Sequence, residues 1–77
     1  MTSSLQRLIE LSSTRYGKDA TTMKAEDDVF EKLGIDSFQA VELMSELEME
    51  FDIEIPDYEL QGVRSFGQLA AAIDKRR

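Results

Sequence analysis

The stretch that decides the fold is DSFQAVELMSELEMEF, at residues 36–51. It opens with Asp36 and Gln39 in the spacing of a capping box, in which each side chain accepts a hydrogen bond from a backbone N–H of the first turn. Apolar residues follow with the spacing i, i+3, i+4, i+7 and i+11; they are Ala40, Leu43, Met44, Leu47 and Phe51. At about 100° per residue they share one face. The stretch therefore predicts an amphipathic helix that ends near Phe51.

The same kind of cap, Ser-x-x-Gln, occurs at Ser3 and at Ser65. Each is followed by apolar residues of helical period, which are Leu5, Leu8, Ile9 and Tyr16 after the first and Phe66, Leu69, Ala70 and Ile73 after the second. Gly17 is a typical helix stop. We therefore expect two further helices, over about residues 4–16 and 66–75.

The segments between these helices lack a sustained period. Residues 17–36 form a connection of about 20 residues, longer than most loops in compact domains. Within it, Val29, Phe30 and Leu33 predict one apolar turn. A loop of this length is expected to be functional or to be held down by its own apolar residues.

The segment after the central helix predicts a connector and a short helix. Residues 52–56 alternate between polar and apolar, but a single short strand without a partner does not form a sheet. We interpret them as an extended connector with Ile53 and Ile55 pointing inward, followed by a short helical turn at residues 56–60. The fold class is therefore all-α, a bundle of three main helices plus one short helix, with a long first loop.

The composition excludes several classes of function. The 77 residues include no Cys, which excludes a disulfide framework, and no His, which removes the usual general base and the commonest metal ligand. The net charge of −7 is a poor match to nucleic acid. No apolar run is long enough to cross a membrane, and no secretory signal is visible. We expect a single cytoplasmic domain over residues 1–77, with no metal site.

The charge is unevenly distributed along the chain. Residues 26–59 hold thirteen acidic residues and one basic residue, whereas the rest holds three acidic and eight basic ones. Such a segment is either a solvated face or a surface that attracts basic partners. The outer face of the central helix mixes apolar residues with acids and consists of Phe38, Val41, Glu42, Ser45 and Met49. This mixture favours a contact surface, although one or two exposed apolar residues are ordinary.

Ser37 is the residue with the most chemical interest. It follows the cap Asp36, so its hydroxyl lies at the positive end of the helix dipole, where a phosphate group would be stabilised by free backbone N–H groups. The spacing alone favours the simpler interpretation, in which Ser37 is an ordinary residue of a first helical turn. It is not a hydrolytic nucleophile, because the chain has no His and no Lys stands next to it.

The sequence around Ser37 resembles a known signature. Residues 33–43, LGIDSFQAVEL, resemble the acyl carrier protein motif LGxDSLxxVEL. Residues 47–57, LEMEFDIEIPD, resemble the stretch LExEFxxxIPD of the same family. The likeness covers about residues 29–73, and the length and acidity of the chain also agree with it.

This resemblance implies a four-helix carrier and not an enzyme. It implies that Ser37 is esterified with 4′-phosphopantetheine, which a holo-carrier synthase (a phosphopantetheinyl transferase) takes from coenzyme A, and that Asp36 belongs to the motif this synthase reads. The thiol of the arm would hold acyl groups as thioesters. The chain is expected to be a monomer that serves acyl-loading, condensing and other acyl-processing enzymes with basic docking patches.

The resemblance also assigns roles along the helix that follows Ser37. Docking to basic partners falls to Glu42, Glu48 and Glu50, with Val41 as an apolar contact. As a hypothesis, an acyl chain would enter the core among Leu47, Ile55, Leu60 and Val63. The alternative for these four residues is ordinary core packing.

Four residues depart from the usual fatty-acid pattern. They are Phe38 in place of Leu, Gln39 in place of an acid, Ser45 in place of an apolar residue and Met49 in place of an acid. The apolar contact has in effect moved one turn along the helix, which suggests a polyketide or other specialised acyl pathway beside fatty-acid synthesis. Two alternatives remain open, an aminoacyl or peptidyl carrier and an unmodified acidic interaction module.

Overall fold

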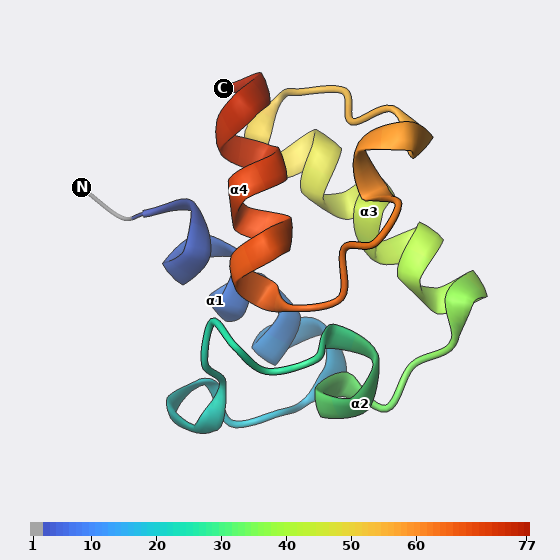
Figure 1. Cartoon of the computed structure of the whole chain (residues 1–77). Coiled ribbons are helices and arrows are strands. Elements are labelled where there is room, and N and C mark those ends of the chain that lie inside the picture. Colours follow the sequence, from blue (N-terminus) through green and yellow to red (C-terminus); the bar gives the residue numbers. More distant parts are fainter. Residues whose placement is uncertain (1–2) are drawn as a thin grey trace.

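The computed structural model describes residues 3–77, apart from the side chain of Asp57. Over this range the chain is helical, with one isolated bridge and no strand (Figure 1). The elements are α1 (Ser4–Tyr16), η1 (Ala20–Thr22), α2 (Val29–Leu33), α3 (Ser37–Phe51), η2 (Asp57–Leu60) and α4 (Phe66–Arg76), where η denotes a 3₁₀ helix. The prediction of an all-α bundle with three main helices and a long first loop is confirmed.

The three predicted capping boxes all form and place the helix starts. The Asp36 carboxylate accepts a 2.9 Å hydrogen bond from the Gln39 N–H, and the Gln39 side chain accepts one of 3.2 Å from the Asp36 N–H. The same reciprocal pair forms at Ser3 and at Ser65. Gly17 ends α1 in the left-handed conformation, at φ 66°, which a glycine adopts without steric cost. The predicted bounds of these helices agree with the structure to within one residue.

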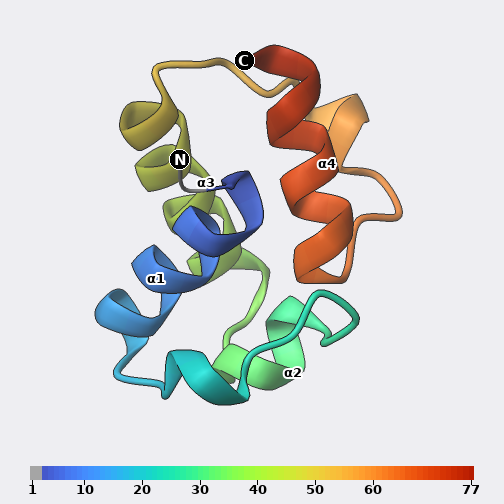
Figure 2. The same cartoon turned by 90° about the vertical axis from the view of Figure 1, so that its left-hand side faces the viewer.

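The core lies between α1, α3 and α4, and the loop with α2 closes one end of it (Figures 1 and 2). All four apolar residues predicted for the last helix are buried. In α3, Leu43 and Leu47 are buried, while Ala40, Met44 and Phe51 pack partly buried against the core. The predicted stripes therefore face one common core.

Apolar residues hold the long first loop against this core, as expected. Val29 and Leu33 are buried on the predicted turn, which is α2, and Met23 and Ile35 are buried on either side of it. The loop is also bonded to the start of α4, because the Val29 N–H donates to the Arg64 carbonyl at 2.7 Å. The loop is thus a packed part of the fold, and it fixes the position at which α3 begins.

The connector after α3 is extended, as predicted, and leads into the 3₁₀ helix η2. Asp52 reverses the chain in the left-handed conformation, at φ 54°. Ile55 is buried and Ile53 packs partly buried against the core, so both point inward. Within the described range, no helix has both the length and the apolar character needed to cross a bilayer.

Candidate functional site

Ser37 is the first residue of α3, and it is exposed. The chain reaches it through Gly34, which ends α2 in the left-handed conformation, and through Ile35, whose buried side chain anchors the turn. Asp36 is the cap, so its carboxylate is directed at the Gln39 N–H. These contacts hold the Ser37 hydroxyl at the surface, at the start of a helix of 15 residues.

The backbone around Ser37 favours a negatively charged group. Helices leave the first N–H groups without intrahelical partners, and the N–H groups of Ser37 and Phe38 have no acceptor within the part of the chain that the structure describes. The dipole of α3 adds a positive potential at the same place. An ester of Ser37 with a phosphate therefore fits the donors present, and the exposed hydroxyl leaves room for an attached arm.

The outer face of α3 is more apolar than acidic. Phe38, Val41 and Met49 are 74%, 65% and 75% exposed, and Ser45 is exposed between them. Because these residues are spaced by three or four, they form one continuous strip along the helix. We call Phe38, Val41, Ser45 and Met49 the apolar strip. It brings together the outer-face residues that the sequence singled out, with Glu42 along one side.

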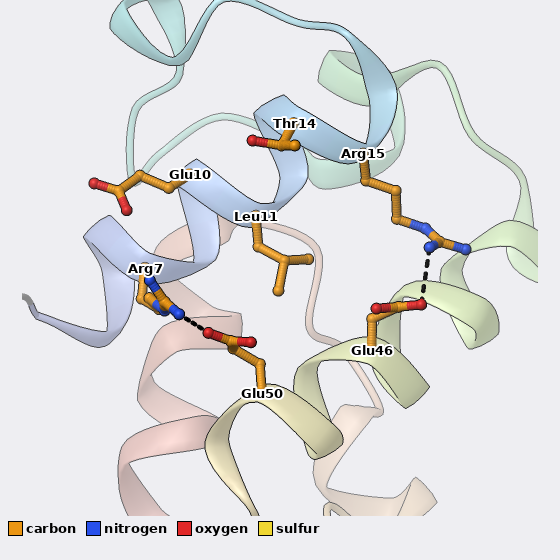
Figure 3. A pocket seen from close by; sticks show the side chains of 7 residues that line it. All are labelled: Arg7, Glu10, Leu11, Thr14, Arg15, Glu46 and Glu50. Atoms are coloured by element: carbon orange, nitrogen blue, oxygen red, sulfur yellow. Dashed lines mark hydrogen bonds and ion pairs between the residues drawn. The ribbon is translucent and has the colours of Figure 1, made fainter.

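The predicted docking acids all have partners within the chain. Glu42 lies 3.8 Å from Arg15, and Glu50 forms an ion pair with Arg7. Glu48 accepts a 2.9 Å hydrogen bond from the Ile55 N–H and so is directed toward the connector. Glu46, which sequence reasoning did not single out, pairs with Arg15 at 3.0 Å (Figure 3). Its position four residues from both Glu42 and Glu50 was the signal that could have identified it.

A small apolar groove of about 140 Å³ opens between α2, α3 and the segment before α4. Its lining consists of Val29, Phe30, Ala40, Val41, Leu43, Met44, Leu60, Val63 and Leu69. Of the four residues predicted to line an acyl chain, Leu60 and Val63 lie here. Leu47 is fully buried in the core, and Ile55 lies beside a different, polar hollow with Glu48. Of the predicted four, the structure therefore brings only Leu60 and Val63 together at this groove.

The residues of α2 complete this groove and were not anticipated. The sequence predicted only that Val29 and Phe30 belong to one apolar turn. Their place beside Met44 depends on how the loop folds back on α3, which the local pattern does not encode. Val41 is shared, since it belongs to the apolar strip and also lines the groove. The strip and the groove are therefore continuous through this residue.

Known proteins resemble this chain over most of its length. Residues 6–73 match the model of a family described as "Phosphopantetheine attachment site". The chain is similar to a protein named "Acyl carrier protein" from Clostridium acetobutylicum, with 41% identity over 64 residues that cover 83% of both chains. It is similar to another of that name from Bdellovibrio bacteriovorus, with 37% identity over 62 residues that cover 80% of both chains. These matches confirm the resemblance noted in the sequence.

Proposed function

The chain belongs to the acyl carrier protein family, whose covalently attached 4′-phosphopantetheine makes it a carrier and not an enzyme, and we propose that its arm is attached to Ser37. When attached, the arm supplies a terminal thiol that holds acyl groups as thioesters. The observation that carries this proposal is the exposed Ser37 hydroxyl at the start of α3, where the N–H groups of Ser37 and Phe38 have no acceptor among the described residues. Asp36 supports it by fixing the first turn through its bond with Gln39.

Docking is proposed to use the outer face of α3. Family members are served by a phosphopantetheinyl transferase and by acyl-processing enzymes. The apolar strip supplies a contact whose residues are already exposed, and Glu42, Glu48 and Glu50 supply negative charge around it. Charge attraction raises the association rate without a large interface, which suits a carrier that visits several enzymes in turn. We propose a monomer that acts in the cytoplasm.

The apolar groove is proposed to take the first part of an acyl chain. Leu60 and Val63 line it, and Val41 connects it to the face on which the arm begins. Its volume is close to that of an apolar cavity known to bind a benzene-sized molecule, so a short acyl segment fits. Leu47 and Ile55 are buried in the core and do not line the groove, and we propose that their packing has to loosen before a longer chain can enter.

The cargo class is proposed to be acyl groups. The names of the similar proteins favour it over the aminoacyl or peptidyl alternative, and the attached cofactor disfavours an unmodified interaction module. The substitutions on the outer face, Phe38 and Met49 above all, favour a polyketide or other specialised acyl pathway over housekeeping fatty-acid synthesis. A holo chain that fatty-acid condensing enzymes accept as well as their own carrier would contradict this finer proposal.

Intact mass spectrometry tests the attachment site. The purified chain is incubated with coenzyme A and a phosphopantetheinyl transferase. The expected result is a gain of one phosphopantetheine group that is absent in Ser37→Ala and retained in Ser45→Ala, a matched control at an exposed serine of the same helix. A gain that persists in Ser37→Ala, or no gain with several transferases, would overturn the proposal.

A further inference from the structure

The arginines of α1 and the glutamates of α3 form a matched row. Arg7 and Arg15 are eight residues apart, on one face of α1 with Leu11 between them. Glu42, Glu46 and Glu50 repeat every four residues and so share one face of α3. Arg7 pairs with Glu50 at one end, and Arg15 lies 3.0 Å from Glu46 and 3.8 Å from Glu42 at the other.

Arg7 with Glu50, and Arg15 with Glu46, line an open hollow of about 410 Å³ between the two helices (Figure 3). The side chains stay accessible, since Arg7 is 51% exposed, Arg15 32% and Glu42 50%. Exposed ion pairs of this kind are weak and are screened by salt. They can therefore exchange partners with a protein that approaches the same face.

The pairs change what the carboxylates of α3 offer to a partner. The helix has four acidic residues and no basic one. Three of the four are paired with α1, and the fourth, Glu48, is bonded to the Ile55 N–H. A lysine or arginine of a docking enzyme thus has to displace an arginine of this chain before it gains a carboxylate. Among the residues that the structure describes, no charged side chain competes in this way for the apolar strip on the same helix.

We propose that Arg7 and Arg15 are built-in competitors for the docking carboxylates of α3, and that they select partners which also make apolar contact with Phe38, Val41 and Met49. This proposal rests on the proposed function. A partner that relies on basic residues alone is attracted less strongly, because Arg7 and Arg15 already neutralise the carboxylates that it would bind. A partner that covers the apolar strip gains binding free energy that does not depend on this exchange.

Transfer kinetics on the full apo chain test this inference. The kcat/KM for phosphopantetheine transfer from coenzyme A is measured at about 0.01 M and about 1 M salt, where the Debye length is about 30 Å and 3 Å. Arg15→Gln should raise kcat/KM about two- to fivefold at low salt, the factor that one exposed ion pair is worth. The matched control is Lys24→Gln, because the Lys24 side chain carries the same charge but forms no ion pair with a residue that the structure describes.

The outcomes separate this inference from the attachment site. The increase in kcat/KM should disappear at high salt. It should also be smaller in the double variant Arg15→Gln/Glu46→Gln, because that variant lacks the Glu46 carboxylate that Arg15→Gln sets free. If wild type is modified but Arg15→Gln reacts no faster than Lys24→Gln, the proposal that Arg15 competes for the carboxylates is overturned. Ser37 would still stand as the proposed attachment site. Wild type that gains no mass would overturn both proposals. Circular dichroism melting of each variant shows that the rates compare folded chains.

Discussion

The carboxylate of Glu48 on α3 accepts a 2.9 Å hydrogen bond from the backbone N–H of Ile55, seven residues further along the chain. The bond spans the reversal at Asp52 and so ties the connector to the helix. Because Ile55 is buried, its N–H is largely withheld from water and needs a partner. Glu48 therefore has a structural role beside the docking role proposed for it.

Substitution of Glu48 should reveal its structural role. Glu48→Ala leaves the Ile55 N–H without its acceptor, and we expect the free energy of unfolding to fall by about 1 kcal/mol or more. Glu48→Gln keeps an oxygen that can accept the bond, so it should lose clearly less. Urea unfolding followed by circular dichroism measures both. Equal losses in the two variants would mean that the charge, and not the hydrogen bond, stabilises the connector.

The apolar strip and the acids should respond differently to salt. Val41→Ala and Met49→Ala remove exposed side chains, so each should change the free energy of unfolding by less than about 0.5 kcal/mol and yet slow acyl loading at every salt concentration. Glu42→Lys should slow loading mainly at low salt, because its effect is electrostatic. Loading rates at several salt concentrations check this. Wild-type rates for Met49→Ala would argue against the strip as a contact.

Local signals explain how much of this fold the sequence could predict. The capping boxes at Ser3, Asp36 and Ser65 involve residues three apart, so their spacing alone placed three helix starts. The reversal at Asp52 carried no comparable signal, since a left-handed aspartate is uncommon and no glycine marks it. The bond from Ile55 to Glu48 depends on that reversal, and it could not be predicted.

In the candidate site, too, local sequence patterns could be recognised, whereas contacts between separate elements could not be predicted. Ser37 could be singled out as a candidate because the motif around it is contiguous in the sequence. The pairing of Arg15 with Glu46 was not predicted. It depends on how α1 and α3 are rotated relative to each other, and the sequence of neither helix alone determines that rotation. Only part of the lining of the groove was predicted, because the rest also depends on how separate elements pack together. Leu60 and Val63 reach it, but the wall contributed by α2 comes from the packing of the long loop.

Asp28 should make the fold sensitive to acid. The hydrogen bond from the Glu31 N–H is the largest effect and lowers the pKa of this carboxyl. Burial opposes it as the next largest effect, and the Arg64 guanidinium lowers the pKa further. Since the folded pKa lies below the unfolded one, Asp28 stabilises the fold above about pH 4. This contribution is lost as the pH falls through the folded pKa.

Asp28→Asn tests this dependence. The variant should be less stable than wild type at neutral pH, and the difference should narrow as the pH falls below about 4. Urea midpoints measured across this range give the comparison. Glu26→Gln is the matched control, because it removes an exposed carboxylate of the same loop. A constant difference between Asp28→Asn and wild type at all pH values would contradict the assignment.

Leu47 and Leu60 should differ sharply in their effect on stability. Leu47 is fully buried, so Leu47→Ala should lower the free energy of unfolding by about 2–5 kcal/mol, enough to unfold much of so small a domain. Leu60 is partly buried at the groove, and Leu60→Ala should cost about 1 kcal/mol. Thermal and urea unfolding give both values. Similar losses would mean that Leu60 belongs to the core and does not border an open groove.

Filling the groove should abolish the stabilisation that we expect from an acyl chain bound there. Each buried CH₂ of the chain is worth about 0.8 kcal/mol, so octanoyl-loaded wild type should melt higher than the acetyl-loaded form. Ala40 lines the groove from α3, where Ala40→Leu places a larger side chain in the empty space. Octanoyl loading should then raise the Tm little. Ala71→Leu, at an exposed position of α4, is the matched control and should behave as wild type does. The same rise in all three proteins would place the acyl chain outside this groove.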